Sequence, residues 1–400
     1  MKHVLISGVT SCESRGVEAL VRSVATHAAV WPDQRTTVLT QTPDLDGAAL
    51  ADLGVRCVAD PFVVSHSWQR LRPVETEQQL ADRGAALLQG ADLVIGTGGD
   101  LHTPDYHVST PYLRVLAEAQ RRSIPTALIG QSLGPFTDTA EADALVAVAS
   151  RCELLSVRES VSAQYALDKL GLPPERIRLS ADPAFLLPQA TASRTAAVLA
   201  DCGLGATDAY TCVAPSRGIT RHSDLTEEQH LRALVHLVTR LVESRGVPVL
   251  LVPHCHDSRP HNDDRILAER VAVEARHPQV RSVHGELSAA DYKGVLVGAG
   301  FVVAERLHAA IGAVSSGTPT IAIGHSHKFH GVLAETYGTD VAQERFHLDI
   351  HAFADDPHAA AVLTGADNEA VLRQALAARL PEAIAAARGD FTLLRRLLRG

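Results

Sequence analysis

The amino-acid sequence predicts an α/β protein with two doubly wound parallel sheets. Short apolar runs recur along the chain, and stretches with helical spacing separate them, which is the pattern of parallel strands joined by crossover helices. The 400 residues are 46% hydrophobic and 21% charged, which is enough apolar material for two or three domains with large cores. Because the strand-and-helix pattern occurs in two blocks, we expect two similar domains.

The first block extends over residues 1–188 and is expected to form the N-terminal domain. Its strands are predicted at residues 4–6, 36–39, 93–96, 126–129, 154–157 and 177–179. Residues 17–28 and 111–121 have the apolar spacing of helices that cover such a sheet.

The remaining chain is divided into three further segments. Residues 189–208 are rich in Ala, Ser, Thr and Gly and are predicted to be a linker, although part of this segment could form a short helix. The second domain is expected over 209–340, and 341–400 form a C-terminal helical segment. Strands are predicted at 211–214, 247–252, 280–283, 301–303 and 320–323, and helices at 226–244, 263–275 and 309–316.

Charge and composition exclude several classes of function. The formal net charge is −9 and no run of lysines or arginines occurs, which argues against a nucleic-acid-binding surface. The first apolar run is too short for a signal peptide, and no stretch approaches the ~20 apolar residues that span a bilayer. The six cysteines form no C-x-x-C pair. We therefore expect a cytoplasmic protein whose partner is a small molecule.

The segment around Arg306 is the most informative part of the sequence. An apolar strand at 301–303 is followed by Glu305, Arg306 and His308 at the start of the next helix. Backbone N–H groups and the helix dipole favour an anion at such a position, and a guanidinium adds two donors that match a phosphate or carboxylate. The alternative is structural: an ion pair of Arg306 with Glu305 or a distant carboxylate, and a capping role for His308.

Loops after the predicted strands of the first domain carry further candidates, since ligands of doubly wound sheets bind at the carboxyl ends of the strands. Residues 8–20 form a glycine-marked loop that lacks both the dinucleotide fingerprint and the P-loop lysine. Residues 96–107 contain adjacent glycines that let a ligand approach the backbone. The candidate acids and bases of this second loop are Asp100, His102, Asp105 and His107.

Residues 130–134 match the G-x-S-x-G pattern of serine hydrolases, with Ser132 at the nucleophile position. A nucleophile elbow requires a helix directly after the serine, but Gly134 and Pro135 delay any helix to about residue 140. A hydrolase is therefore disfavoured.

Two other loops could bind ligands. Arg158 ends a predicted strand and is a second anion-binding candidate, with a salt bridge to Glu159 or Asp182 as the structural alternative. Residues 253–264 contain three histidines and three aspartates, but lack the tight pairing of a zinc site, so we favour contact of His254 and its neighbours with a polar acceptor over metal binding.

Several segments, in this order along the chain, resemble the polysaccharide pyruvyl transferase family. They are SRGVEAL at 14–20, GGD at 98–100, GQSLGP at 130–135, VRES at 157–160, DPAF at 182–185, RLHA at 306–309, GTP at 317–319 and Lys328. The resemblance implies two Rossmann-like domains arranged as in GT-B glycosyltransferases, with an interdomain cleft. It also implies transfer of a pyruvyl group from phosphoenolpyruvate to a saccharide or glycoside as a cyclic ketal, with release of phosphate.

The resemblance also implies roles for particular residues. Arg158, Arg306 and His308 match the family's catalytic and donor-binding positions, and Leu307 and Lys328 complete the expected donor site. The expected acceptor site consists of Arg15, Glu18, Gly99, Asp100, His102, Asp105, His107, Gln131 and His254. Phosphoenolpyruvate acts as co-substrate, and neither a cofactor nor a metal is expected.

The C-terminal residues 368–399 have leucines at helical spacing. In a GT-B-like protein we expect this helix to return to the first domain; the alternative is an interface of a homo-oligomer. Two other functions remain open. A GT-B glycosyltransferase would use Arg306 and Lys328 on a nucleotide diphosphate, and a non-catalytic relative would bind a sugar or an anion without turnover.

Overall fold

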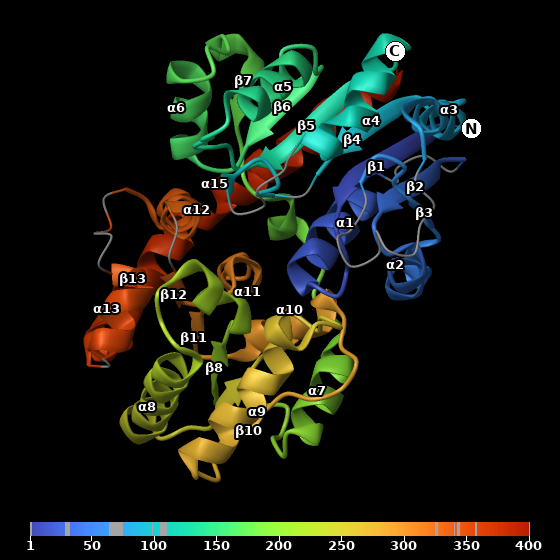
Figure 1. Ribbon diagram of the computed structural model, residues 1–400. Coiled ribbons are helices and arrows are strands. Elements are labelled where there is room, and N and C mark those ends of the chain that lie inside the picture. Colours follow the sequence, from blue (N-terminus) through green and yellow to red (C-terminus); the bar gives the residue numbers. More distant parts are fainter. Residues whose placement is uncertain are drawn as a thin grey trace. The chain divides into compact units, whose positions relative to one another are not determined.

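The computed structural model describes residues 2–28, 33–63, 75–97, 99–104, 110–324, 327–339, 341, 345–356 and 358–399. The chain divides into two compact units (Figure 1). Unit 1 comprises Met1–Cys12, Leu20–Pro183 and Ala385–Gly400, and unit 2 comprises Glu13–Ala19 and Ala184–Ile384.

Unit 1 is built on a parallel sheet. Within its described residues the sheet has seven strands in the order β3-β2-β1-β4-β5-β6-β7. The strands are β1 (His3–Val9), β2 (Arg35–Thr40), β3 (Arg56–Ala59), β4 (Leu93–Gly96), β5 (Thr126–Gln131), β6 (Leu154–Val157) and β7 (Ile177–Leu179). The chain order reverses between β1 and β4, so the switch point of this sheet lies there.

Helices and short 3₁₀ turns connect these strands. They are α1 (Arg15–Ala28), α2 (Pro43–Ala49), η1 (Ala51–Leu53), α3 (Glu77–Leu88), α4 (Thr110–Arg121), α5 (Thr139–Ala149), α6 (Ser160–Asp168) and η4 (Pro174–Arg176). After β7, η5 (Pro183–Leu186) lies where the chain passes from unit 1 to unit 2. Leu5, Val94, Leu128 and Leu155 from four strands pack with Leu116 of α4 in one core cluster. Burial of the strands between helix layers explains why they are apolar runs without alternation.

Unit 2 has the same kind of sheet. Its described strands lie in the order β10-β9-β8-β11-β12-β13, all parallel. They are β8 (Thr211–Ala214), β9 (Val249–Leu251), β10 (Val280–Ser282), β11 (Phe301–Ala304), β12 (Thr320–Gly324) and β13 (His347–Asp349). The switch point lies between β8 and β11, so the loops after these two strands are where a ligand of unit 2 is expected.

Capping residues mark the ends of helices in unit 2, and α8 is an example. Thr226 and Gln229 form a capping box before α8, and Gly246 ends that helix in the left-handed conformation. The elements are α7 (Ala192–Asp201), η6 (Arg217–His222), α8 (Glu227–Arg245), η7 (Pro260–Asn262), α9 (Asp264–Ala275), α10 (Ala289–Gly298), α11 (Leu307–Val314), α12 (His327–Tyr337), α13 (Ile350–Asp355), α14 (Ala359–Leu363) and α15 (Ala366–Arg399).

The predicted α/β class with two doubly wound sheets is confirmed. The structure differs from the sequence-based division at several boundaries. Residues 184–188, expected in the first domain, belong to unit 2, and the expected C-terminal segment 341–400 belongs to unit 2 up to Ile384 and to unit 1 from Ala385. Residues 189–208, expected as a linker, contain helix α7 and belong to unit 2. The short segment Glu13–Ala19, expected within the first domain, also belongs to unit 2.

Helix α15 contributes residues to both units. Its last residues, from Ala385 onward, belong to unit 1. There the buried carboxylate of Asp390 accepts hydrogen bonds from Ser156 Oγ of β6 at 2.6 Å and from Arg178 Nε of β7 at 2.7 Å. A buried acceptor with two donors attaches the end of the helix to this sheet.

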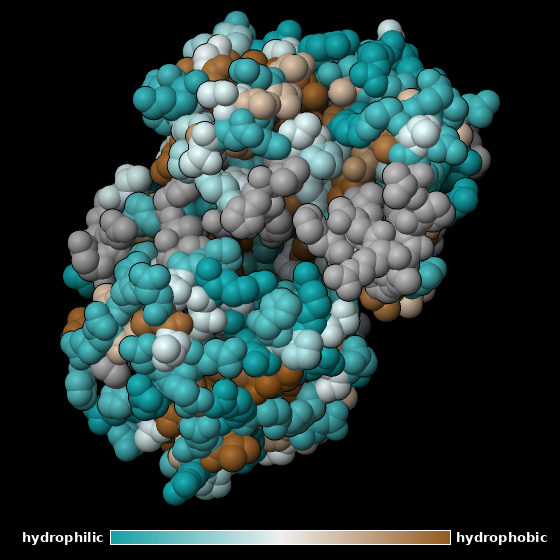
Figure 2. All heavy atoms as spheres, viewed as in Figure 1, coloured by the Kyte–Doolittle hydropathy of each residue, from teal (hydrophilic) through white to brown (hydrophobic). Residues whose placement is uncertain are grey.

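The surface seen in Figure 2 is mainly hydrophilic outside the grey residues, with small hydrophobic groups between the polar ones. No helix among the described residues is long and apolar enough to cross a bilayer.

Replacing Asp390 by Ala should lower the free energy of unfolding by about 2 kcal/mol, because it removes a carboxylate that accepts two hydrogen bonds and leaves a buried hydroxyl short of a partner. Urea denaturation measures the change. Arg388→Ala, at an exposed position of the same helix, is the matched control and should stay within about 0.5 kcal/mol of the parent. Equal urea midpoints for the two variants would contradict the conclusion that Asp390 attaches the end of α15 to the sheet of unit 1.

Candidate active site

Arg306 lies at the switch point of unit 2, between β11 and the first turn of α11. It is the N-cap residue of α11, with extended backbone angles of φ −110° and ψ 121°. Its guanidinium forms a bidentate ion pair with Asp264, from Nε to Oδ2 at 2.9 Å and from Nη2 to Oδ1 at 2.7 Å. The distant carboxylate that the structural alternative required therefore exists, 42 residues away in the sequence.

Asp264 is fully buried at the start of α9. Burial raises its pKa, while the charge of Arg306 and the backbone N–H of Arg217 act in the opposite direction. Because both donors come from the loops after β8 and β11, the carboxylate holds the two sides of the switch point together and sets the plane of the Arg306 guanidinium.

Glu305, directly before Arg306, is also buried and points to a second set of donors. Its carboxylate accepts a hydrogen bond from the backbone N–H of Ser216 at 2.8 Å and lies 2.8 Å from His230 Nε2. Although burial opposes it, the charge of Glu305 raises the pKa of His230 above its ordinary value. The strand end that carries Arg306 is thus held from two directions.

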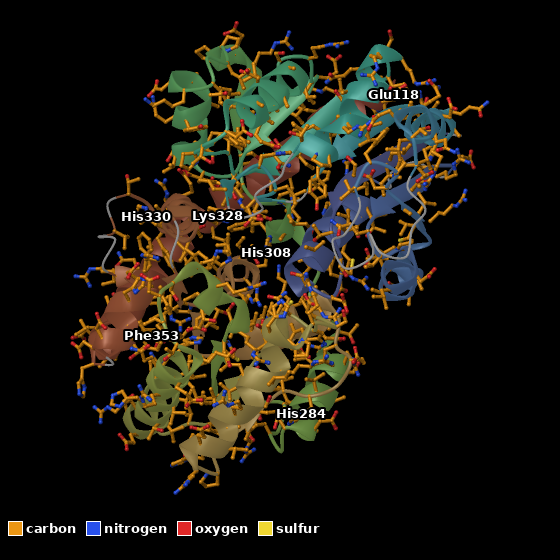
Figure 3. All side chains as sticks on the ribbon, viewed as in Figure 1. Glu118, His284, His308, Lys328, His330 and Phe353 are labelled. Atoms are coloured by element: carbon orange, nitrogen blue, oxygen red, sulfur yellow. The ribbon has the colours of Figure 1, made fainter. Side chains whose placement is uncertain are left out.

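His308 is the second residue of α11 and is labelled in Figure 3. A Cβ atom built on Gly16 would lie 2.6 Å from His308 Nδ1, which is closer than a real side chain tolerates. Only glycine at position 16 therefore lets the imidazole lie against the first turn of α1. Gly16 of the SRGVEAL segment therefore packs against this ring.

Three residues from the expected acceptor site lie in the same unit. Arg15, buried at the start of α1, donates to Glu18 Oε2 at 2.9 Å, and its backbone N–H donates to the carbonyl of His254 at 2.9 Å. Arg15 Nη2 also lies 3.2 Å from Nδ1 of His256, whose Nε2 is 2.7 Å from the Tyr292 hydroxyl. Since the guanidinium can only donate, Nδ1 of His256 is the acceptor and the proton is on Nε2.

Both histidines are held in the neutral form. Burial lowers the pKa of His254 to about 3, and burial together with the charge of Arg15 lowers the pKa of His256 to about 4. The charges of Arg306 and His308 contribute to the shift of His254, which places this ring in the same electrostatic neighbourhood.

Lys328 and Leu307, the other expected donor residues, also belong to unit 2. Leu307 is the buried first residue of α11. Lys328 is buried in the first turn of α12, after β12, which is the neighbour of β11 in the sheet (Figure 3). The structure thus collects Arg306, Leu307, His308 and Lys328 at the carboxyl ends of adjacent strands.

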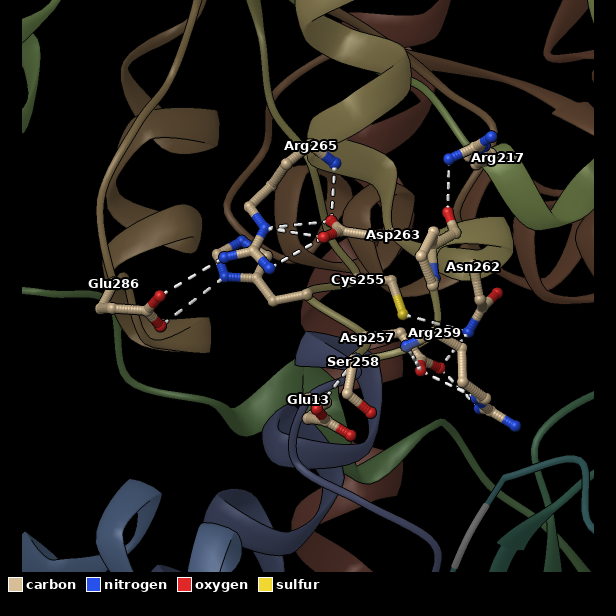
Figure 4. Close-up of polar contacts among 12 residues, drawn as sticks. Glu13, Arg217, Cys255, Asp257, Ser258, Arg259, Asn262, Asp263, Arg265 and Glu286 are labelled. Atoms are coloured by element: carbon tan, nitrogen blue, oxygen red, sulfur yellow. Dashed lines mark hydrogen bonds and ion pairs between the residues drawn. The ribbon is translucent and has the colours of Figure 1, made fainter. Parts of the chain in front are cut away.

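The loop at 253–264 is organised by ion pairs and caps (Figure 4). Asp257 accepts from Arg259 and Asn262, and although burial opposes it, these hydrogen bonds lower the pKa of Asp257 to about 2. Asp263 caps α9 and pairs with Arg265. Among the described residues, no group of three or more His, Cys, Asp or Glu side chains is arranged to hold a metal.

Arg158 belongs to unit 1 and is fully buried. Its Nη1 donates to Asp182 at 2.7 Å and its Nε to Ser132 at 2.8 Å, with Glu159 at 3.5 Å. This is the salt bridge that the structural alternative for Arg158 required. Ser132 is an acceptor for this arginine, and the next helix starts only at Thr139, in agreement with the argument against a hydrolase.

Gly99, Asp100 and Gln131, three further acceptor candidates of unit 1, lie near Arg158. A Cβ atom on Gly99, which has φ +67°, would lie 2.8 Å from Arg158 Nη1, so the glycine permits close packing of the arginine. The Nδ1 of His102 and the Oε1 of Gln131 are buried and have no hydrogen-bond partner among the described residues. Burial lowers the pKa of His102 to about 4. Asp100 precedes this histidine, whereas Asp105 and His107 lie outside the described residues.

Sequence reasoning missed the partners of these residues. Asp264, Gly16 and His256 were not predicted as site residues. Each of them nevertheless contacts a predicted site residue, which is Arg306, His308 and Arg15, respectively. Asp264 and Arg306 are 42 residues apart in the sequence, and only a three-dimensional contact identifies their ion pair. The structure also divides the expected acceptor residues, placing Arg15, Glu18 and His254 in unit 2.

Acid should destabilise the protein through His254 and His256. Unfolded histidine titrates near 6.5 and these two titrate near 3 and 4 when folded, so the unfolded state binds more protons between those values. The free energy of unfolding should therefore fall as the pH drops below about 6.5, by about 1.4 kcal/mol per pH unit for each histidine.

Urea titrations from pH 7 to pH 4.5 test this expectation. In His256→Gln, the free energy of unfolding should depend less steeply on pH, because the contribution of one histidine is lost. His351→Gln, at an exposed position of α13, is the control and should leave this pH dependence unchanged. An unchanged slope in His256→Gln would show that His256 is not held neutral.

Comparison with known proteins agrees with the fold and identifies a family. The structure is similar to the S. aureus MnaA–UDP co-structure, with a TM-score of 0.60 and 10% identity over 98% of this chain and 95% of that one. It is equally similar to UDP-GlcNAc 2-epimerase from Neisseria meningitidis bound to UDP-GlcNAc, with a TM-score of 0.60 and 9% identity over 100% of both chains. These likenesses confirm the predicted GT-B type of fold.

Among curated proteins, the amylovoran biosynthesis protein AmsJ of Erwinia amylovora is 27% identical over 274 residues. The aligned region covers 67% of this chain, and the chain spans 64% of the length of AmsJ. Residues 27–327 match the family model described as polysaccharide pyruvyl transferase. The chain, with its Arg306 and His308 at the switch point of unit 2, therefore belongs to the polysaccharide pyruvyl transferase family.

Proposed function

We propose that this protein transfers the pyruvyl group of phosphoenolpyruvate to a saccharide or glycoside acceptor, forming a cyclic ketal and releasing phosphate. The observation that carries the proposal is the orientation of Arg306 at the start of α11 by the buried carboxylate of Asp264, with His308 within the same helical turn. Family membership supplies the reaction class, and the name of AmsJ, a biosynthesis protein for amylovoran, supports a carbohydrate acceptor.

Donor binding is assigned to unit 2. Phosphoenolpyruvate is an anion with a phosphate and a carboxylate, and an oriented guanidinium at a helix N-terminus suits either group. Arg306, Leu307, His308 and Lys328 lie together at the ends of β11 and β12, which supports this assignment. Phosphoenolpyruvate is a co-substrate in this proposal, and no cofactor or metal takes part.

The chemistry requires proton transfers that His308 can perform. A proton is added to the methylene carbon of phosphoenolpyruvate, and one acceptor hydroxyl attacks C2. A second hydroxyl then displaces phosphate from the same carbon, and both hydroxyl protons leave. We assign to His308 the donation of a proton to the donor or to the departing phosphate, and to Arg306 the neutralisation of negative charge.

Each unit has its own candidates for binding the acceptor. In unit 2 they are Arg15, Glu18 and His254, which hydrogen bonds of Arg15 link to one another, and in unit 1 they are Gly99, Asp100, His102 and Gln131 at the carboxyl ends of β4 and β5. Buried polar atoms on His102 and Gln131 that have no partner among the described residues are suited to hydroxyl groups. Arg158 is proposed to support these loops, because its side chain is buried against Ser132, Glu159 and Asp182.

Replacing His308 by Gln should lower turnover by about 10²-fold or more, the usual effect of removing one acid–base group. Release of phosphate from phosphoenolpyruvate in the presence of carbohydrate acceptors measures it. His284→Gln, an exposed histidine of the same unit, should keep full turnover (Figure 3). Near-normal turnover of His308→Gln would remove His308 from the mechanism.

Removing Arg306 should abolish donor binding, but the choice of variant matters. Arg306→Ala alone leaves the buried Asp264 without its ion pair, which is strongly destabilising. The double variant Arg306→Ala/Asp264→Asn removes both charges, and we expect it to fold while its affinity for phosphoenolpyruvate falls by tenfold or more.

Calorimetric titration with phosphoenolpyruvate and, in parallel, with UDP-glucose measures this loss. The parent protein should bind phosphoenolpyruvate, and Asp264→Asn alone should show an intermediate affinity, since the guanidinium is kept but no longer held by a charged partner. Binding of UDP-glucose without binding of phosphoenolpyruvate would replace the proposal by glycosyl transfer.

A further inference from the structure

One positively charged side chain at the switch point of unit 2 has no role in the assignments above. Arg221 lies on η6, the turn that follows β8, and its side chain is exposed to solvent. Its Nη2 donates to Asn262 Oδ1 at 2.7 Å. Within the described part of the chain, no carboxylate forms an ion pair with this guanidinium.

The backbone of Gly218 brings Arg221 close to Arg306. A Cβ atom built on Gly218 would lie 2.9 Å from Arg221 Nη2, 3.5 Å from Arg306 Nη2 and 2.8 Å from Asn262 Oδ1. The two guanidinium nitrogens therefore flank the same point, and the absence of a side chain at position 218 leaves room for both.

The neighbouring arginines already have counter-charges. Arg306 is paired with Asp264, and Arg259 is paired with Asp257 at 2.8 and 2.5 Å (Figure 4). Arg221 adds a further positive charge next to these pairs. Its partial burial and then the charges of Arg306 and Arg259 lower the pKa of Arg221, which is the effect expected where cations converge.

Converging guanidiniums favour an anion that can accept hydrogen bonds from more than one of them. A phosphate group has several oxygens and a charge close to −2, and arginine donors match its geometry. Arg221 and Arg306 follow β8 and β11, the strands between which the order of the sheet reverses, and ligands of doubly wound sheets bind at that position.

We propose that Arg221 and Arg306 together bind the phosphate group of the donor, over the backbone of Gly218. The identity of the donor as phosphoenolpyruvate rests on the proposed function, but binding of a phosphate group does not. This assigns to η6 a part in donor binding that the sequence motifs did not indicate.

Two variants separate the site from the fold. Arg221→Gln removes the charge and keeps a hydrogen-bonding side chain near Asn262. Gly218→Ala adds a methyl group between the ends of flexible side chains, at a residue outside the glycines with positive φ, so we expect the fold to be retained. Arg240→Gln, an exposed arginine of α8 that pairs with Glu243, is the matched control.

Calorimetric titration of each protein with inorganic phosphate and with phosphoenolpyruvate tests the proposal, and thermal denaturation confirms folding. Arg221→Gln and Gly218→Ala should each weaken binding of both probes by about tenfold or more, as expected for loss of charge-assisted hydrogen bonds. Arg240→Gln should bind both probes as the parent does.

The outcomes are distinguishable from those of the proposed function. Phosphate binding that depends on Arg221, in a protein that releases no phosphate from phosphoenolpyruvate, would support the site and contradict the pyruvyl transfer. Unchanged affinities in Arg221→Gln, loss with phosphoenolpyruvate but not with phosphate, or absence of binding of both probes to the parent protein would overturn the phosphate site.

Discussion

The bidentate ion pair between Arg306 and the buried Asp264 is the interaction on which the candidate site of unit 2 depends. A carboxylate with no solvent contact is costly unless donors surround it, and here the donors are the Arg306 guanidinium and the backbone of Arg217. These donors come from the two strands that border the switch point. The hydrogen bonds that satisfy the Asp264 carboxylate therefore also fix the loops after β8 and β11 relative to each other. They hold the Arg306 side chain at the start of α11.

Unit 1 also contains an ion pair between an arginine and a buried carboxylate, but its arginine is not accessible to solvent. Arg158 also follows a strand and also pairs with a buried carboxylate, that of Asp182, but its side chain is completely enclosed. A quarter of the Arg306 side chain remains accessible. Two arginines that looked equivalent as anion-binding candidates thus differ in the property that decides whether a ligand can reach them, which is exposure of the guanidinium.

The predictions from sequence succeeded where local pattern determines structure. Central strands such as β1 and β11 are apolar because helices cover both faces, so their positions could be predicted. The edge strands β3 and β13 were missed, since their residues are partly exposed and mixed in polarity. Arg306 and His308 could be recognised from their place after a strand. Their partners Asp264 and Gly16 could not, because a contact between distant segments leaves no periodic signal.

The assignment of Glu13–Ala19 to unit 2, with both flanking segments in unit 1, has a consequence for the history and the engineering of this chain. Neither unit is encoded by one continuous stretch, since unit 1 also includes the end of α15. A single crossover between genes near residue 184 would therefore exchange incomplete bodies, and it would separate Gly16 from His308. Recombination within the family is expected to preserve residues 13–19 together with the segment that carries His308, and a chimaera that exchanges a whole unit needs four junctions.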